Sequence, residues 1–219
     1  MTVAISVTDL VFGYQKGNFT LSCPHLRLEQ GKLSLITGAN GSGKTTLAKL
    51  ICGILRPSGG SVQIFGQATS ELSLGEIGRQ VGYLFQDPSR QLFAGTVWKE
   101  MTFVDHLLES EQGTSTKKAQ DLLDRFGLGE LKSRSIYFLS GGEKQRLALC
   151  TILMGEPRFL ILDEPTVGLD KQNRVILYDI LDDLLREGRG IAVITHENEL
   201  IERFAGAPQI KVERGQVSL

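Results

Sequence analysis

Residues 38–45 limit what this chain can fold into more than any other stretch does. They read Gly-Ala-Asn-Gly-Ser-Gly-Lys-Thr and match the phosphate-binding pattern G-x-x-x-x-G-K-S/T at every fixed position. The apolar run 32–37 before them predicts a buried strand, and residues 44–51 after them have the composition of a helix. This order of strand, glycine-rich loop and helix predicts an α/β protein that holds phosphate groups at the loop.

Each residue type in this loop has a chemical reason. Glycines allow a tight turn and bring backbone N–H groups close to phosphate oxygens, and the following helix points the positive end of its dipole at them. Lys44 can reach the β- and γ-phosphates, and the Thr45 hydroxyl can ligate Mg²⁺. The alternative is a glycine-rich turn with a solvated lysine. We expect the nucleotide to be bound here by Asn40, Gly41, Ser42, Gly43, Lys44, Thr45 and Thr46.

The composition of the 219 residues narrows the class of protein. Hydrophobic residues make up 41% and charged residues 22%, as in soluble globular proteins. A formal net charge of −1 argues against nucleic acid as the main partner. Cys23, Cys52 and Cys150 are widely spaced, which predicts buried thiols in a reducing compartment. We read no signal peptide and no bilayer-spanning stretch, so we expect any work at a membrane to depend on docking to other subunits.

The N-terminal part of the chain predicts an antiparallel β portion. Apolar residues alternate in part over 3–12 and again over 19–28, as in half-exposed strands. Gln30-Gly31 then reads as the turn of a hairpin that pairs the second strand with strand 32–37.

The rest of the chain predicts an α/β core interrupted by helices. The expected strands are 61–65, 80–85, 159–162 and 191–194, and a last hairpin covers 209–219 with its turn at Arg214-Gly215. The expected helices are 97–108, 117–126, 141–154, 173–185 and 197–204. Ser115 or Thr116 is a candidate N-cap of the second of these helices. We expect one domain, with a core at 1–86 and 154–219 and a helical lobe at about 87–153.

Two carboxylates follow the buried strand 159–162. Asp163 and Glu164 lie where ligands bind in open α/β sheets, at the carboxyl end of a strand. Asp163 is placed to hold Mg²⁺ near Thr45, and Glu164 could polarise the water that attacks the γ-phosphorus. The alternative is that Asp163-Glu164-Pro165 simply ends the strand in a turn.

A second glycine-containing helix start occurs at Ser140. Ser140 and Glu143 have the spacing of a capping box, which is the structural explanation for these two residues. A capping box does not explain Gly141 and Gly142 in the first turn, where glycine lowers helix stability. Glycines there would let a phosphate approach bare backbone N–H groups.

Residues 139–145 resemble the signature motif of ABC-type ATPases, with Glu143 where many members carry glutamine. The order of motifs also resembles that family along essentially the whole chain. Gly38–Thr45 resembles Walker A, Gln86 resembles the Q-loop glutamine, and Phe159–Glu164 resembles Walker B with the catalytic glutamate. Gly168–Asp170 resembles the D-loop, and His196 resembles the switch histidine. Tyr14 lies where the family places an aromatic residue on adenine.

The resemblance implies a P-loop ABC ATPase cassette with a mixed core sheet, an antiparallel β subdomain and an inserted helical lobe. It implies ATP and Mg²⁺ as cofactors, with Thr45, Gln86 and Asp163 at the metal. The catalytic residues would be Lys44, Gln86, Glu164 and His196. Two chains, identical or paralogous, would pack head to tail, with each ATP between Walker A of one chain and Ser140, Gly141 and Gly142 of the other.

Four of these residues also have simpler explanations. Tyr14 could only pack, Gln86 could be an exposed turn amide, and His196 could be a polar residue at a strand end. Asp170 could cap the following helix instead of, or in addition to, acting between subunits.

The stretch from Gln86 to Val97 resembles the Q-loop region of energy-coupling-factor ATPases, which drive uptake of vitamins and transition metals. This resemblance implies a peripheral subunit at the cytoplasmic face of the cell membrane, docked near 86–97 to integral membrane subunits. Leu92 and Phe93 could relay the nucleotide state or fill the core of the lobe. We also expect Asp87 and Glu100 to meet basic residues of the membrane partner.

Other functions are weaker fits to the sequence. Another ABC importer or exporter would differ around the Q-loop. A soluble ABC ATPase of DNA repair or translation would carry a long coiled-coil insertion or two cassettes, and this chain has neither. A small-molecule kinase or GTPase would leave residues 139–145 unexplained.

Overall fold

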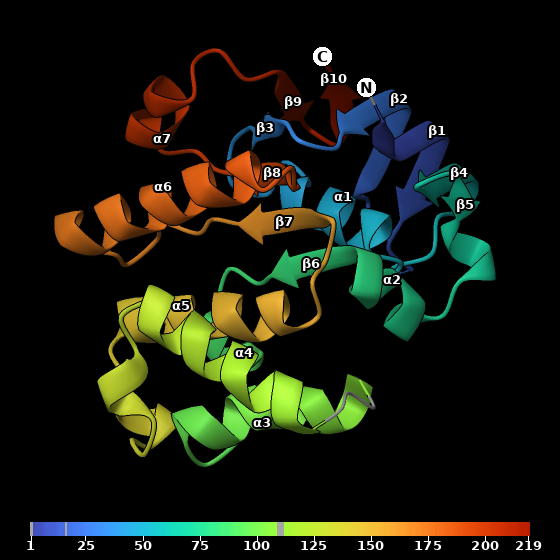
Figure 1. Ribbon diagram of the computed structural model, residues 1–219. Helices are drawn as coiled ribbons and strands as arrows, with labels where there is room; N and C mark the ends of the chain where they lie inside the picture. The colour runs from blue at the N-terminus through green and yellow to red at the C-terminus, as the bar shows by residue number, and fades with distance from the viewer. Residues whose placement is uncertain (1, 16, 109–111) are drawn as a thin grey trace.

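One ten-stranded sheet organises the computed structural model, which describes residues 2–15, 17–108 and 112–219. The strands lie in the order β5-β4-β1-β2-β10-β9-β3-β8-β7-β6 (Figure 1). Their bounds are β1 Val3–Gly13, β2 Thr20–Glu29, β3 Leu33–Thr37, β4 Gly59–Ile64, β5 Gln67–Ala68, β6 Val81–Leu84, β7 Phe159–Asp163, β8 Gly190–Ile194, β9 Gln209–Glu213 and β10 Gln216–Ser218. The α/β class with a mixed sheet is therefore confirmed.

The sheet has a parallel half and an antiparallel half. β6, β7, β8, β3 and β9 pair in parallel, whereas β2, β1, β4 and β5 pair antiparallel. The halves meet where β10 pairs with β2 at Gln216 and Ser22. The expected hairpin at Gln30-Gly31 is wrong, because β3 pairs with β8 and β9 and not with β2. β3 is apolar on both faces, and such a strand is stabilised in the centre of a parallel sheet.

The helices cover both faces of the parallel half. Their bounds are α1 Lys44–Ile51, α2 Leu74–Gln80, α3 Val97–Leu108, α4 Gln112–Arg125, α5 Gly141–Met154, α6 Lys171–Arg186 and α7 Asn198–Arg203, with 3-10 turns at Thr69–Glu71, Pro88–Arg90, Gly129–Leu131 and Ile136–Phe138. Leu35 of β3 lies in an apolar cluster with α3, α4, α5 and α6, while the next residue, Ile36, lies in a cluster with α1 and the antiparallel strands. Successive side chains of a strand point to opposite faces, so each buried strand joins both cores.

The predicted elements agree with the structure in most places. α3 has the expected bounds, and Arg214 and Gly215 turn the last hairpin with positive φ values of 48° and 80°. The N-cap expected at Ser115 or Thr116 is wrong, because α4 begins at Gln112. Serine and threonine cost a helix interior little, so they do not force a helix start. α2 was not expected, although Ser73 and Glu76 form a capping box that the sequence pattern could have indicated.

Helices α3, α4 and α5 lie between β6 and β7 in chain order and gather at one end of the molecule (Figure 1). They share their apolar cluster with one face of the sheet, so the division into core and lobe stays a prediction. None of the helices in the described ranges is long and apolar enough to cross a membrane.

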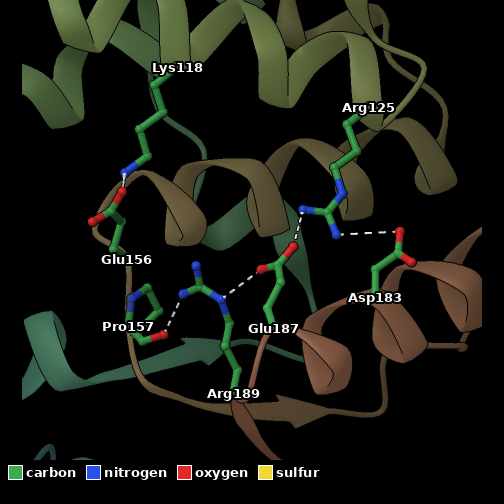
Figure 2. Close-up of polar contacts among 7 residues, drawn as sticks. All are labelled: Lys118, Arg125, Glu156, Pro157, Asp183, Glu187 and Arg189. Carbon is green, nitrogen blue, oxygen red and sulfur yellow. Dashed lines mark hydrogen bonds and ion pairs between the residues drawn. The ribbon is translucent and has the colours of Figure 1, made fainter.

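Basic residues attach α4 to two segments of the core (Figure 2). Lys118 Nζ lies 2.6 Å from Glu156 Oε1, just beyond α5, and Arg125 Nη1 lies 2.8 Å from Glu187 Oε1, just beyond α6. Arg189 joins the two attachments, because it contacts Glu187 and donates to the Pro157 carbonyl at 2.6 Å. Pairs this exposed contribute on the order of 0.2–1 kcal/mol each, so the network orients α4 more than it stabilises the fold.

All three cysteines are free and buried, as expected. Burial raises the pKa of Cys23 to about 11 and that of Cys52 to about 12. Thiols with such pKa values stay protonated near neutral pH and act as small apolar side chains.

Candidate nucleotide site

The candidate site lies where β3, β7 and β8 end side by side. Because these strands are parallel neighbours, their carboxyl ends bring Gly38, Asp163 and Thr195 to one edge of the sheet. A cleft of about 760 Å³ opens there. It is lined by Tyr14, Phe19, Asn40, Gly41, Gly43, Lys44, Thr45, Thr46, Gln86, Asp163, Glu164, Val167, Gly168, His196 and Glu197. The fold therefore brings most of the predicted nucleotide and catalytic residues together.

The loop after β3 leaves the N-terminus of α1 without a side-chain cap. Its N-cap residue, Gly43, has a φ of 115°, and within the described ranges no side chain caps the first turn by a hydrogen bond. The first N–H groups of a helix need an acceptor, which an anion can supply. Lys44 is buried, and its Nζ donates to the carbonyl of Gly38 at 2.8 Å and to that of Ala39 at 3.2 Å.

Ser42 is the one residue of the predicted loop set 40–46 that does not line the cleft. Its side chain is buried, and its carbonyl accepts from the Gly215 N–H at 2.9 Å. Gly38 is also held against the sheet, since a Cβ at that position would clash with the Val212 carbonyl oxygen. The loop is thus anchored to β9 and to the β9–β10 turn. The anchoring fixes the backbone that faces the cleft.

Asp163 presents a buried carboxylate oxygen that has no partner. The side chain is 1% exposed; Oδ2 accepts from the Tyr83 hydroxyl at 3.1 Å, whereas Oδ1 has no hydrogen-bond partner in the described chain. Burial raises the pKa of this carboxyl group, and the Thr45 and Tyr83 hydroxyls and the Lys44 charge oppose the rise. A carboxylate oxygen beside a hydroxyl oxygen suits Mg²⁺, which prefers such hard ligands. Gln86, exposed at the end of β6, adds an amide oxygen at the mouth of the cleft.

Glu164 is held between a histidine and a lysine. Its Oε1 lies 2.7 Å from His196 Nδ1 and 4.0 Å from Lys44 Nζ, and the residue is 4% exposed. Its Oε2 is buried without a hydrogen-bond partner among the described residues. The φ of Glu164 is 50°, a left-handed conformation that is strained for a residue with a side chain and is often found at functional sites.

Tyr14 both packs and lines the cleft. Its ring makes an edge-to-face contact with Phe12 at 4.9 Å, and its hydroxyl lies 3.2 Å from Thr46 Oγ1. The residue is still 42% exposed. Packing alone therefore does not account for Tyr14, and a role against adenine stays a prediction.

The residues of the signature-like segment lie apart from this cleft. Ser140, Gly141 and Gly142 are not among its lining residues. Ser140 and Glu143 form the expected capping box at the start of α5, with the Glu143 N–H 3.2 Å from Ser140 Oγ. Gly142 also has a packing reason, because a Cβ there would approach the Asn173 side chain to 2.9 Å. A Cβ at Gly141 would make only an ordinary contact with the Gly168 carbonyl oxygen at 4.0 Å, so packing does not explain Gly141 and its role in phosphate binding stays a prediction.

Asp170 caps α6. Its Oδ1 accepts from the Asn173 N–H at 2.8 Å, and the hydrogen bond lowers the pKa of the carboxyl group. The capping explanation is confirmed, and a role between subunits stays a prediction.

The stretch after Gln86 is fastened to the core by two side chains, the half-buried Gln91 and the buried Glu100. Gln91 accepts from the Phe85 N–H at 2.7 Å and donates to the Tyr83 carbonyl at 2.9 Å. Glu100 is 2% exposed and accepts from the N–H groups of Phe93 at 3.0 Å and Ala94 at 2.6 Å. The expectation that Glu100 meets basic residues of a partner is wrong, because its carboxylate is buried and supports this loop.

The two apolar residues of this loop point in different directions. Leu92 is 8% exposed and belongs to the core, whereas Phe93 is 59% exposed and contacts Phe103 edge to face at 4.6 Å. Asp87 is exposed and accepts from the Ser89 N–H at 3.1 Å. A neighbouring groove of about 370 Å³ includes Ile54 and Leu74 in its lining, and Leu74 is 60% exposed.

Several site residues were missed by sequence reasoning. Tyr83 was predicted only as one residue of the apolar strand 80–85. A tyrosine in a buried strand needs a hydrogen-bond partner for its hydroxyl, which could have indicated its role. Glu197 directly follows His196, and its charge next to a predicted catalytic residue was a usable signal. Phe19 and Val167 line the cleft with no distinguishing sequence pattern.

The strand order of the sheet, the glycine-rich loop 38–45 and the acidic residues at the end of β7 together define a nucleotide-binding α/β ATPase. The ABC transporter family model matches residues 21–167, and the chain belongs to this family. It is the ATP-binding subunit of an ABC transporter, and it hydrolyses ATP.

Particular relatives and one solved structure are similar to the chain over nearly its whole length. A Pyrococcus horikoshii protein provisionally named as an ABC transporter ATP-binding protein is 40% identical over 92% of this chain and 77% of its own length. The energy-coupling factor transporter ATP-binding protein EcfA1 of Thermotoga maritima is 34% identical over 90% of this chain and 74% of its own. The structure of CbiO1 from Clostridium perfringens, part of the ABC transporter complex CbiONQ, has a TM-score of 0.88 and 29% identity and covers 100% of this chain and 88% of its own.

The contact between Tyr83 and Asp163 gives a testable prediction. Tyr83→Phe removes the hydroxyl that orients the Asp163 carboxylate, and loss of such a supporting hydrogen bond lowers metal affinity about 10-fold. We expect the Mg²⁺ concentration for half-maximal hydrolysis to rise by that factor, while ATP affinity without metal is unchanged. Tyr178→Phe is the control, because the Tyr178 hydroxyl is buried on α6 without a hydrogen-bond partner in the described residues. Equal Mg²⁺ dependence in both variants would contradict the assignment.

Proposed function

We propose that this chain is the ATP-hydrolysing subunit of an energy-coupling-factor importer for a vitamin or a transition-metal ion. The observation that carries the ATPase part is the buried group of Lys44, Asp163 and Glu164 at an uncapped helix N-terminus, with unpaired oxygens on both carboxylates. The importer part is supported by the names of EcfA1 and CbiO1, which are similar over nearly the whole chain.

In this proposal each cleft residue has one task. Loop residues 40, 41 and 43–46 bind the phosphates together with the α1 N-terminus, and Tyr14 stacks on adenine. Thr45, Asp163 and Gln86 hold Mg²⁺, which neutralises phosphate charge when bound. Glu164 orients the attacking water through its unpaired Oε2, and His196 holds Glu164 through Oε1.

The proposal also requires a second chain. Ser140, Gly141 and Asp170 do not line the cleft of their own chain, yet all three are exposed. We infer that these residues meet the ATP of a neighbouring cassette, either a second copy or a paralogue, in a head-to-tail dimer. Nucleotide binding then favours the closed dimer, and hydrolysis removes the contact that holds it.

The membrane subunits are proposed to dock beside residues 86–97, which puts this subunit at the cytoplasmic face of the membrane. The support is an apolar groove beside this loop, in which the exposed side chains of Ile54 and Leu74 lie with Gln91, while Phe93 is exposed on the loop itself. Exposed apolar side chains gathered in this way are typical of protein interfaces. Gln91 and Glu100 hold the loop from inside, so the surface is preformed.

The dimer is tested with Glu164→Gln. This variant keeps the phosphate loop and loses the carboxylate, so we expect it to bind ATP, hardly hydrolyse it and accumulate as a closed dimer. Light scattering with ATP, on the chain alone and mixed with its related cassette, measures this. The matched control adds Lys44→Ala, which removes the phosphate contact and should stay monomeric. A Glu164→Gln chain that binds ATP and remains monomeric in both mixtures would refute the dimer.

The docking surface is tested by purification from membranes. Leu74→Asp places a charge in the apolar groove, so we expect the tagged variant to lose at least about 10-fold of its membrane subunits, the change that about 1.4 kcal/mol produces. Val3→Asp, at an exposed apolar position on β1, should retain them. Mass spectrometry of the retained subunits decides the transporter class, since permeases of another ABC importer or exporter would favour that alternative. Full retention by Leu74→Asp would contradict the docking site.

A further inference from the structure

Arg174 of α6 joins two separate loops of the nucleotide cleft. Its Nε donates to the Leu169 carbonyl at 3.1 Å. Its Nη1 lies 3.1 Å from Glu197 Oε2, and its Nη2 donates to Glu197 Oε1 at 3.3 Å. Nη1 also lies 3.1 Å from Glu199 Oε2. A planar guanidinium can hold such fixed partners simultaneously, which a lysine cannot do.

The two loops joined by Arg174 are next to the proposed reacting groups. Leu169 follows Gly168, which lines the cleft. Glu197 follows His196, whose Nδ1 lies 2.7 Å from Glu164 Oε1. A chain of contacts therefore runs from Leu169 through Arg174 and Glu197 to the carboxylate proposed to orient water.

Glu197 depends on Arg174 for its charge partner. Its side chain is 18% exposed, and within the described ranges Arg174 is the only cation that pairs with it. The Glu197 N–H donates to Thr195 Oγ1 at 3.0 Å, so the backbone on both sides of His196 is fixed. Loss of Arg174 would leave the Glu197 carboxylate without this partner beside His196, which is unfavourable for a mostly buried charge. Because the side chain is 18% exposed, we expect it to turn toward solvent and release its hold on the His196 loop.

We propose that Arg174 is a positioning residue that holds His196 against Glu164 by clamping Glu197 to the Leu169 carbonyl. The clamp makes the hydrolytic step depend on where residues 168–170 lie, the segment that the dimer model puts at the second chain. This inference rests on the proposed roles of Glu164 and His196. It assigns no contact between Arg174 and ATP, because Arg174 does not line the cleft.

A merely structural link between α6 and α7 exists elsewhere and supplies the control. Arg203 Nη2 of α7 lies 2.6 Å from Asp182 Oδ2 of α6, so this pair joins the same two helices, which lie side by side (Figure 1). It touches neither Leu169 nor Glu197. Arg203→Gln therefore removes a more exposed ion pair between the same helices without disturbing the clamp.

The test compares Arg174→Gln with Arg203→Gln in ATP hydrolysis, ATP binding and thermal unfolding. We expect Arg174→Gln to lower kcat about 10- to 100-fold, because small misplacements of reacting groups have effects of that size. Its KM for ATP and its Tm should stay close to those of Arg203→Gln, which keeps its kcat. Arg174→Lys should recover only part of kcat. A kcat within about twofold of the control, or a loss matched by an equal loss of ATP affinity or Tm, would overturn the proposal.

A double-variant cycle shows whether Arg174 acts through Glu197. Glu197→Gln should lower kcat to a similar degree, and the double variant should be no worse than either single one. Multiplied losses would overturn the clamp. Glu164→Gln separates the two levels of inference: if it hydrolyses ATP normally, the proposed function fails, whereas if it is inactive and Arg174→Gln is active, only the clamp fails.

Discussion

The uncapped N-terminus of α1 is the constraint around which the site is built. α2, α5 and α6 each begin with a side chain that accepts from the first turn, but α1 begins with Gly43 and has no such acceptor. Helix N–H groups without a side-chain acceptor can be satisfied by water or by a bound anion, and the α1 start opens into the cleft where an anion can bind them. β3, which pairs with β8 on one side and β9 on the other, leads into this helix start at the edge of the sheet where the site lies.

The buried charges of the cleft follow the same logic. Lys44, Asp163 and Glu164 are each at most 6% exposed, although isolated buried charges are destabilising. Lys44 is partly satisfied by loop carbonyls and lies 4.0 Å from Glu164, and both carboxylates keep one unpaired oxygen. A phosphate chain with a divalent cation would supply the acceptors and the positive charge that these groups lack. These buried charged groups are therefore incompletely paired until the ligand binds. Such a loss of stability is common at functional sites.

The parts of the site that were predicted depend on residues adjacent in sequence. The loop before Lys44, the Asp163-Glu164 pair and the Ser140 capping box are each contained in a few residues, so their chemistry is visible without a fold. The missed parts depend on pairings between distant segments. Tyr83 meets Asp163 only because β6 lies beside β7, and the false hairpin at Gln30 arose because the true partners of β3 come much later in the chain. From the sequence alone, Glu100 is expected to be an exposed acidic residue. It is buried because the loop that contains Phe93 and Ala94 lies over it and donates two N–H groups to its carboxylate.

The central claim is that one chain binds the phosphates and that Ser140 of a second chain completes the binding site. A single titration of Ser140→Arg with ATP, following bound nucleotide and released phosphate together, tests it most directly. Because Ser140 does not line its own chain's cleft, the account predicts that the isolated variant binds ATP with unchanged affinity while phosphate release is lost. Normal phosphate release, or a matching loss of ATP binding by the isolated chain, would contradict it.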